Sequence, residues 1–341
     1  MNHSTINDST RSHRGWIVSP WFDLAFIVNA WWLLALLPAT RGVSASQDTA
    51  FDLWQIYFVI APHRWITLVL VATDPDRREG RQRFFLGIAL IAAIGVALAA
   101  YGFGSLRCVV LVDFLWNAWH FASQHGGILR MYGRMAGGGR PLLERWGLRV
   151  FITYTNLRAA GWATGWTEQV PAARAAMLWL DGIVMVPALV LLVLELIDRP
   201  WERPGKSLYL LSVMGLYGLL LASIRGADPR RAILMASATS AFHSVEYLAI
   251  VSFYAMRRQS SGSPQGLFRL MARQWVRVLA IYMLVLGFSG LYLDRYYHEW
   301  FLGINLWAAF LHYAYDGMIW KLRRPETART LNVELPGTAA G

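Results

Sequence analysis

Long apolar runs alternate with short, arginine-rich polar connections along nearly the whole chain. Because a helix needs roughly 20 apolar residues to cross the hydrocarbon core of a bilayer, each run predicts one spanning helix. The runs predict about ten spans, at residues 16–38, 51–73, 84–104, 106–129, 149–166, 174–197, 207–225, 232–256, 275–293 and 300–320. The fifth run contains Asn156 and Arg158, so a re-entrant or tilted segment is an alternative there. The pattern therefore predicts an all-α, polytopic transmembrane helix bundle.

The predicted helical domain covers residues 16–322. Residues 1–15 are predicted to form a disordered tail and residues 323–341 a flexible tail, both in the cytoplasm. The first apolar run contains Asp23 and Asn29 and lacks the plain apolar centre of a signal peptide. We therefore expect this run to be retained as the first span.

Composition and charge agree with a membrane protein, because 56% of the 341 residues are hydrophobic and only 16% are charged. The net charge of +11 comes from basic residues in short loops beside apolar runs, which favours membrane topology over nucleic-acid binding. On the predicted topology 23 Lys and Arg residues lie on one face and 7 on the other. The positive-inside rule then places both termini in the cytoplasm, and we expect a bacterial-type inner (plasma) membrane.

Five of the eight histidines lie inside apolar runs, where ionisable side chains are costly and usually functional. Four of them, in the second, fourth, eighth and tenth predicted spans, lie about 12 to 20 Å before the cytoplasmic ends of helices that run in the same direction. A single histidine also fits a hydrogen bond between helices, but four at one depth indicate ligands that converge in a bundle core. The predicted metal ligands are His63, His120, His243 and His312.

Carboxylates and the fifth histidine accompany these residues at helical spacing. Glu246 follows His243 by three residues, and Asp316 follows His312 by four. Asp113 precedes His120 by two turns, and His125 follows it by somewhat more than one turn. We predict Glu246 as a further ligand and Asp113, His125 and Asp316 as groups that orient ligands or move protons.

The only cysteine, Cys108, excludes an intramolecular disulfide and a Cys-rich zinc site. Any metal must then rely on histidine and carboxylate ligands, a set that suits Fe(2+), Mn or Zn, and open positions on it favour non-haem iron. Pro62, directly before His63, is expected to kink its helix, because proline removes a backbone hydrogen bond.

Four short windows resemble the Brp/Blh (bacteriorhodopsin-related) family of membrane dioxygenases, which cleave beta-carotene. They are Ala61-Pro62-His63, His120-Phe121, Phe242-His243-Ser244 and the late His312, which is followed by an acidic residue. The resemblance implies Fe(2+), dioxygen and a lipid-soluble, unsaturated substrate such as a carotenoid. The chain departs from the family at Tyr247, where the motif has a second histidine, and at Leu311, where it has proline. Glu246 or His312 would then complete the ligand set.

These observations predict a membrane-embedded non-haem iron oxygenase that acts on a lipid-soluble, carotenoid-like or other unsaturated substrate. The expected partners are the lipid bilayer, an apolar small molecule and dioxygen, without nucleic acid. Three alternatives remain open: a di-iron desaturase or hydroxylase, a haem b electron-transfer protein, and a proton-coupled transporter that uses His and Asp.

Overall fold

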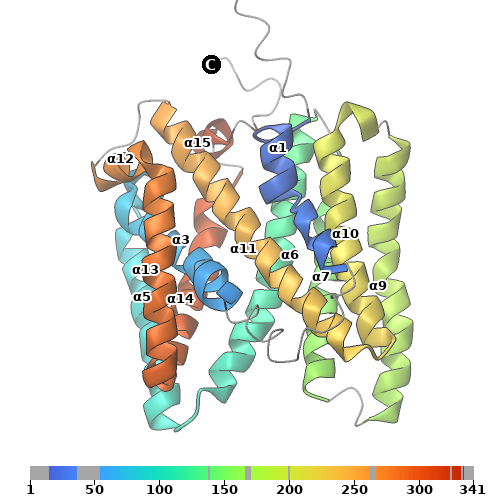
Figure 1. The fold of residues 1–341 in the computed structure, drawn as a ribbon, viewed down its shortest axis with the longest axis horizontal. Helices are drawn as coiled ribbons and strands as arrows, with labels where there is room; N and C mark the ends of the chain where they lie inside the picture. Colours follow the sequence, from blue (N-terminus) through green and yellow to red (C-terminus); the bar gives the residue numbers. More distant parts are fainter. Residues whose placement is uncertain are drawn as a thin grey trace, which may run out of the picture. The chain divides into compact units, whose positions relative to one another are not determined.

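The computed structural model describes residues 15–36, 54–136, 139–165, 170–198, 200–260, 266–322, 325–331 and 333. All regular secondary structure in these residues is helical (Figure 1), which confirms the predicted all-α class. The chain divides into two compact units. Unit 1 comprises Met1–Leu37, Ala118–Glu246 and Asn332–Gly341, and unit 2 comprises Pro38–Asn117 and Tyr247–Leu331. Apart from Gly15, the predicted tail over residues 1–15 lies outside the described residues.

The division falls within two long helices, so each of them contributes residues to both units. These helices are α6 (Arg107–Met135) and α11 (Pro229–Ser260). The remaining helices of unit 1 are α1 (Pro20–Phe22), η1 (Asp23–Ile27), η2 (Ala30–Leu36), α7 (Pro141–Ala163), α9 (Pro171–Ile197), η5 (Pro200–Glu202) and α10 (Pro204–Arg225). Helices α7, α9 and α10 pack against one another. A Cβ atom at Gly147 would lie 3.3 Å from the carbonyl oxygen of Pro187, so glycine permits the close approach of α7 and α9.

The first predicted span is not one helix, which corrects the expectation for residues 16–36. A short α-helical turn and a π-helical turn end at Ile27, and a 3-10 helix follows from Ala30. Between them Asn29 has a positive φ of 49°. Its side-chain amide donates to the carbonyl oxygen of Phe242 at 3.1 Å and its Oδ1 accepts from the indole of Trp31 at 2.8 Å. Asparagine tolerates this left-handed conformation, so the polar residue breaks the helix.

Unit 2 contains η3 (Ile56–Ile60), α3 (Ala61–Thr73), α4 (Pro75–Arg78), α5 (Gln82–Ala97), η4 (Leu98–Gly102), α12 (Gly266–Arg273), α13 (Trp275–Tyr296), α14 (His298–Ile319) and α15 (Pro325–Thr330). Helix α14 packs against α3, α5 and α13. The distortion expected at Pro62 is present, because η3 is a π-helical segment directly before it. Pro62 has no N–H to bond the carbonyl four residues earlier, so the preceding turn widens.

Helix α15 lies inside the segment 323–341 that was predicted to be a flexible tail. Thr327 and Leu331 are buried, and the guanidinium of Arg77 donates to the Thr327 hydroxyl at 3.1 Å. Residues 325–331 of this tail are therefore packed within unit 2.

Six helical segments of the described residues are long and apolar enough to cross a membrane, which indicates a membrane protein. They are Ile56–Thr73, Gln82–Gly102, Ala172–Ile197, Pro204–Arg225, Pro229–Ser260 and Trp275–Tyr296. The predicted number of ten is not confirmed. Helix α6 is among the predicted spans that are absent from this set, and it contains Asp113, His120, Gln124 and His125, which lower its hydropathy.

These spans differ in how much of their surface other helices cover. Only 11% of the span in α13 and 17% of the spans in α5 and α9 are buried, against 67% of the span in α11. The uncovered side chains are mostly large and apolar, such as Ile91, Trp179 and Val276. An uncovered apolar helix face is suited to contact with lipid.

Unit 1 also buries a group of charged residues near the ends of four helices. Lys206 on α10 lies 2.8 Å from Oε1 of Glu144 on α7 and 2.9 Å from Oε2 of Glu195 on α9. Arg130 on α6 also pairs with Glu144, and Arg203 pairs with Glu195. Burial by itself raises the pKa of Glu144, but Lys206 and Arg130 outweigh it, so this pKa is lowered. Each buried charge in this group is paired with an opposite charge, which offsets the cost of removing it from water.

Candidate metal centres

Three potential metal ligands lie together in unit 1, and all of them are fully buried. They are His125 on α6 and the pair His243 and Glu246 on α11. One donor atom from each lies within 4.8 Å of the others. His243 and Glu246 are three residues apart, so the helix itself places them on one face. Two imidazoles and a carboxylate form the kind of donor set that binds Fe(2+).

Glu246 is the most strongly bonded residue of this centre. Its Oε1 accepts a hydrogen bond from the Tyr209 hydroxyl at 2.5 Å, and its Oε2 accepts one from Nε2 of Gln124 at 2.7 Å. Nδ1 of His125 lies 3.3 Å from the same Oε2. Both carboxylate oxygens of Glu246 are therefore engaged, and these neighbours fix the orientation of its carboxyl group.

His125 is held at both ring nitrogens by tyrosine hydroxyls. Nδ1 lies 2.9 Å from the hydroxyl of Tyr209, and Nε2 lies 3.3 Å from the hydroxyl of Tyr217. A histidine engaged on both sides is suited to orienting neighbours or moving a proton. These contacts agree with the role that we predicted for His125, which stays a prediction.

His120 also belongs to the unit 1 centre. Its ring centroid lies 5.1 Å from that of His243, in an edge-on arrangement. Phe121 stacks on the ring of His243, with ring centroids 3.9 Å apart. The side-chain amide of Gln124 donates a hydrogen bond to the carbonyl oxygen of His243 at 2.9 Å. Unit 1 therefore brings together His120, His125, His243 and Glu246, which the sequence had proposed as site residues.

Unit 2 has its own pair of buried histidines, His63 on α3 and His312 on α14. Their ring centroids are 4.9 Å apart. His63 is 2% exposed and His312 is 0% exposed. Thr67, one turn after His63, lies with its hydroxyl 2.7 Å from Nδ1 of His312. Because Thr67 engages Nδ1, Nε2 is the ring nitrogen of His312 that could bind a metal. An outer partner that orients a ligating imidazole in this way is usual at metal sites.

The same threonine connects His312 to the acidic residue predicted beside it. The Thr67 hydroxyl lies 2.6 Å from the hydroxyl of Tyr247 and donates to Oδ1 of Asp316 at 3.1 Å. The other carboxylate oxygen of Asp316 lies 3.7 Å from Nδ1 of His312. Asp316 thus lies beside His312, as their spacing of four residues on α14 predicted.

Tyr247 occupies the position at which the family resemblance called for a histidine. Its hydroxyl donates to Oδ1 of Asp316 at 2.6 Å and accepts from the indole of Trp320 at 3.1 Å. Its ring centroid lies 4.9 Å from that of His312. Tyr247 therefore acts in unit 2 as a hydrogen-bonding partner of the carboxylate.

Asp113 has a different set of contacts from those expected. It belongs to unit 2, whereas His120 belongs to unit 1. Tyr313 donates to its Oδ1 at 3.0 Å, and the charge of Arg64 acts on both of these residues. The opposite charges of Arg64 and Asp113 therefore act on each other in the interior of unit 2. The role of Asp113 as a companion of His120 stays a prediction.

The predicted four-histidine site draws two residues from each unit, so it too stays a prediction, as does the identity of the metal. Sequence reasoning missed the residues that hold the ligands. Thr67 and Gln124 follow His63 and His120 by four residues, a spacing that indicates a shared helix face. Tyr209 carries no such signal, because its partners lie on other helices.

Comparison of the chain with protein-family models, curated proteins and solved structures finds no match.

Proposed function

We propose that the chain is a membrane-embedded, non-haem iron oxygenase that acts on a lipid-soluble, unsaturated substrate, with a carotenoid-like molecule as the leading class. The observation that carries this proposal is the fully buried group of unit 1, in which potential donor atoms of His243 and Glu246 lie within 4.8 Å of each other and of a ring nitrogen of His125. Buried imidazole and carboxylate donors in apolar helices favour a metal whose chemistry needs a water-poor site.

Each residue has a role in this proposal. His120, His243 and Glu246 in unit 1, and His63 and His312 in unit 2, are the metal ligands. Tyr209 and Gln124 hold the carboxylate of Glu246, and Thr67 holds the ring of His312. His125 and Asp316 orient their neighbours and hold or move a proton. Bound Fe(2+) would supply the activation of dioxygen.

The apolar character of the helices supports a substrate that arrives through the lipid phase. Helices α5, α9 and α13 expose mostly apolar side chains along their spans. The carotenoid-like class itself rests on the family resemblance of the sequence windows around His63, His120 and His243. The placement of the chain in an inner membrane with both termini in the cytoplasm rests on the distribution of basic residues.

Metal analysis and an optical spectrum of the detergent-purified full chain test the proposal. We expect iron without a Soret band, together with oxygen consumption in the presence of a carotenoid. His120→Ala should abolish bound iron and turnover, whereas His125→Ala should lower turnover and retain iron. His298→Ala is the matched control, because this histidine is 66% exposed and pairs with Asp294.

Three results would contradict the proposal in different ways. Stoichiometric iron in the His120→Ala variant would remove this residue from the ligand set. A Soret band would favour a haem b electron-transfer protein. Solute uptake by proteoliposomes made from metal-free protein would favour a transporter.

A further inference from the structure

A basic pocket lies at one end of α5 and α14 in unit 2. It has a volume of about 820 Å³ and is lined by Gly80, Arg81, Gln82, Arg83, Phe84, Met318 and Lys321. Three of these residues are cationic and none is acidic. Such a lining is complementary to an anion, and the first turn of α5 adds the positive end of a helix dipole.

The wall of this pocket is built around Arg81. Its guanidinium donates to the carbonyl oxygens of Arg77 at 2.8 Å and Met318 at 3.4 Å, and lies 5.4 Å from the centre of the Phe85 ring. These contacts fix one cation beside the ends of both helices. Arg83 is exposed and Lys321 is half-buried, so their long side chains can reach an anion in the pocket.

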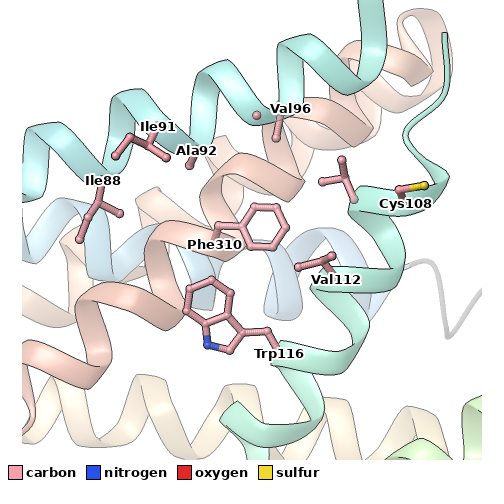
Figure 2. Close-up of a pocket in the computed structure, with 10 residues that line it drawn as sticks. Ile88, Ile91, Ala92, Val96, Cys108, Val112, Trp116 and Phe310 are labelled. Atoms are coloured by element: carbon pink, nitrogen blue, oxygen red, sulfur yellow. The ribbon is translucent and has the colours of Figure 1, made fainter. Parts of the chain in front are cut away.

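An apolar pocket lies further along α5, and its other walls are formed by α6 and by Phe310 of α14 (Figure 2). It has a volume of about 390 Å³ and is lined by Ile88, Ile91, Ala92, Gly95, Val96, Cys108, Val109, Val112, Trp116 and Phe310. Figure 2 shows Phe310 and Trp116 between α5 and α6, and their ring centroids are 5.9 Å apart. The polar atoms among these lining side chains are the sulfur of Cys108 and the indole nitrogen of Trp116.

One face of α5 connects the two pockets. Phe84 lines the basic pocket, and Ile88, Ile91 and Gly95 line the apolar one, at spacings of four, three and four residues. This spacing keeps them on one side of the helix. Phe84 is 58% exposed, Ile91 is 72% exposed and Ile88 between them is half-buried, so the connecting face is accessible at both of its ends. From residue 82 to residue 92 the helix rises about 15 Å, roughly half of the hydrocarbon thickness of a bilayer.

We infer that unit 2 binds an anionic phospholipid, with the headgroup phosphate in the basic pocket and one acyl chain in the apolar pocket. The basic pocket lies at the end of a candidate span, Gln82–Gly102, which is where lipid headgroups are found. The apolar continuation along α5 selects a phospholipid over free phosphate, because inorganic phosphate gains nothing from that face. Basic pockets between membrane helices are known sites for anionic headgroups.

Native mass spectrometry of the detergent-purified full chain tests this inference. We expect added phosphatidylglycerol to be retained more strongly than phosphatidylcholine with the same acyl chains. The double substitution Arg83→Gln and Lys321→Gln should weaken phosphatidylglycerol binding about twenty-five-fold, because each cation near an anionic headgroup contributes roughly fivefold. The control is Arg269→Gln with Arg273→Gln, which removes the same charge from exposed positions on α12.

The acyl-chain part of the site is tested separately. Ile91→Ser should weaken phosphatidylglycerol binding by about threefold to tenfold, because it removes apolar contact with the chain. Ile281→Ser is the control, since Ile281 is similarly exposed on α13 and lines neither pocket. Equal retention of the two lipids would overturn the inference. Displacement of the lipid by inorganic phosphate, with Ile91→Ser without effect, would overturn it in favour of a free-phosphate site.

Discussion

The two units hold their histidines by different chemistry. In unit 1 the central group is a carboxylate, Glu246, which accepts hydrogen bonds from Tyr209 and Gln124. In unit 2 the central group is a neutral hydroxyl, that of Thr67, which contacts His312 and Asp316. A buried carboxylate is costly unless donors surround it, whereas a hydroxyl can donate and accept at once.

The two centres therefore depend in different ways on the rest of their units. Thr67 lies one helical turn from His63, so α3 alone supplies both a histidine and the group that organises its neighbours. The donors to Glu246 come from α6 and α10, which are remote from α11 in sequence. The centre of unit 1 therefore needs a correctly packed set of helices, and three substitutions can break or sharpen this contrast.

The largest effect is expected from the charged group that holds the helix ends of unit 1. Lys206→Met leaves Glu144 and Glu195 buried without their shared cation, which should lower the free energy of unfolding by about 3–5 kcal/mol. Thermal unfolding in detergent measures the loss. Arg225→Met is the control, because Arg225 is exposed on the same helix.

The loss caused by Lys206→Met should depend on pH. The pKa of Glu144 is lowered in the folded chain, so its stabilisation is fully present above the ordinary value of 4.5. It is lost progressively as the pH falls from that value through the lower pKa of the folded chain, where Glu144 becomes protonated. Measurements from pH 7 down to pH 3.5 should show the difference between wild type and variant shrinking. An unchanged difference would contradict a role for the Glu144 pair.

A smaller loss is expected at the centre of unit 1 itself. Tyr209→Phe removes a hydroxyl that contacts both Glu246 and His125, which should cost about 1–3 kcal/mol because it leaves buried polar groups without a hydrogen-bond partner. Tyr154→Phe removes a similar hydrogen bond, to Asp181 at 2.6 Å. We expect both variants to lose stability but only Tyr209→Phe to lose bound iron. Equal iron contents would separate Tyr209 from the metal site.

The smallest of the three effects is expected in unit 2. Thr67→Ala removes the hydroxyl beside Nδ1 of His312, and the loss of such an outer partner weakens metal binding by about tenfold to a hundredfold. Thr67→Ser should restore binding, because it retains the hydroxyl. Competition with a chelator measures the affinity. Thr73→Ala is the control, since that hydroxyl bonds only to the carbonyl of Val69 on its own helix among the contacts described. Similar affinities for Thr67→Ala and Thr67→Ser would contradict this role.

Much of the fold was predictable because apolar runs are a local property of the chain. The helices containing His63, His120, His243 and His312 form as expected, and the distortion at Pro62 follows from the chemistry of proline. The first span was mispredicted, because hydropathy does not register that Asn29 adopts a left-handed backbone and bonds to Phe242.

Relations within a single helix could be predicted from the order of residues. The pairs His243 with Glu246 and His312 with Asp316 follow from the 3.6-residue period, which acts over one turn. The hydrogen bonds of Tyr209 to Glu246, of Tyr247 to Asp316 and of Tyr313 to Asp113 emerge from the packing of the folded chain. These contacts join different helices, and they depend on how each helix is rotated about its axis and which helix packs beside it. Hydrophobic periodicity does not specify which helix packs beside which, because any apolar helix face can pack against any other.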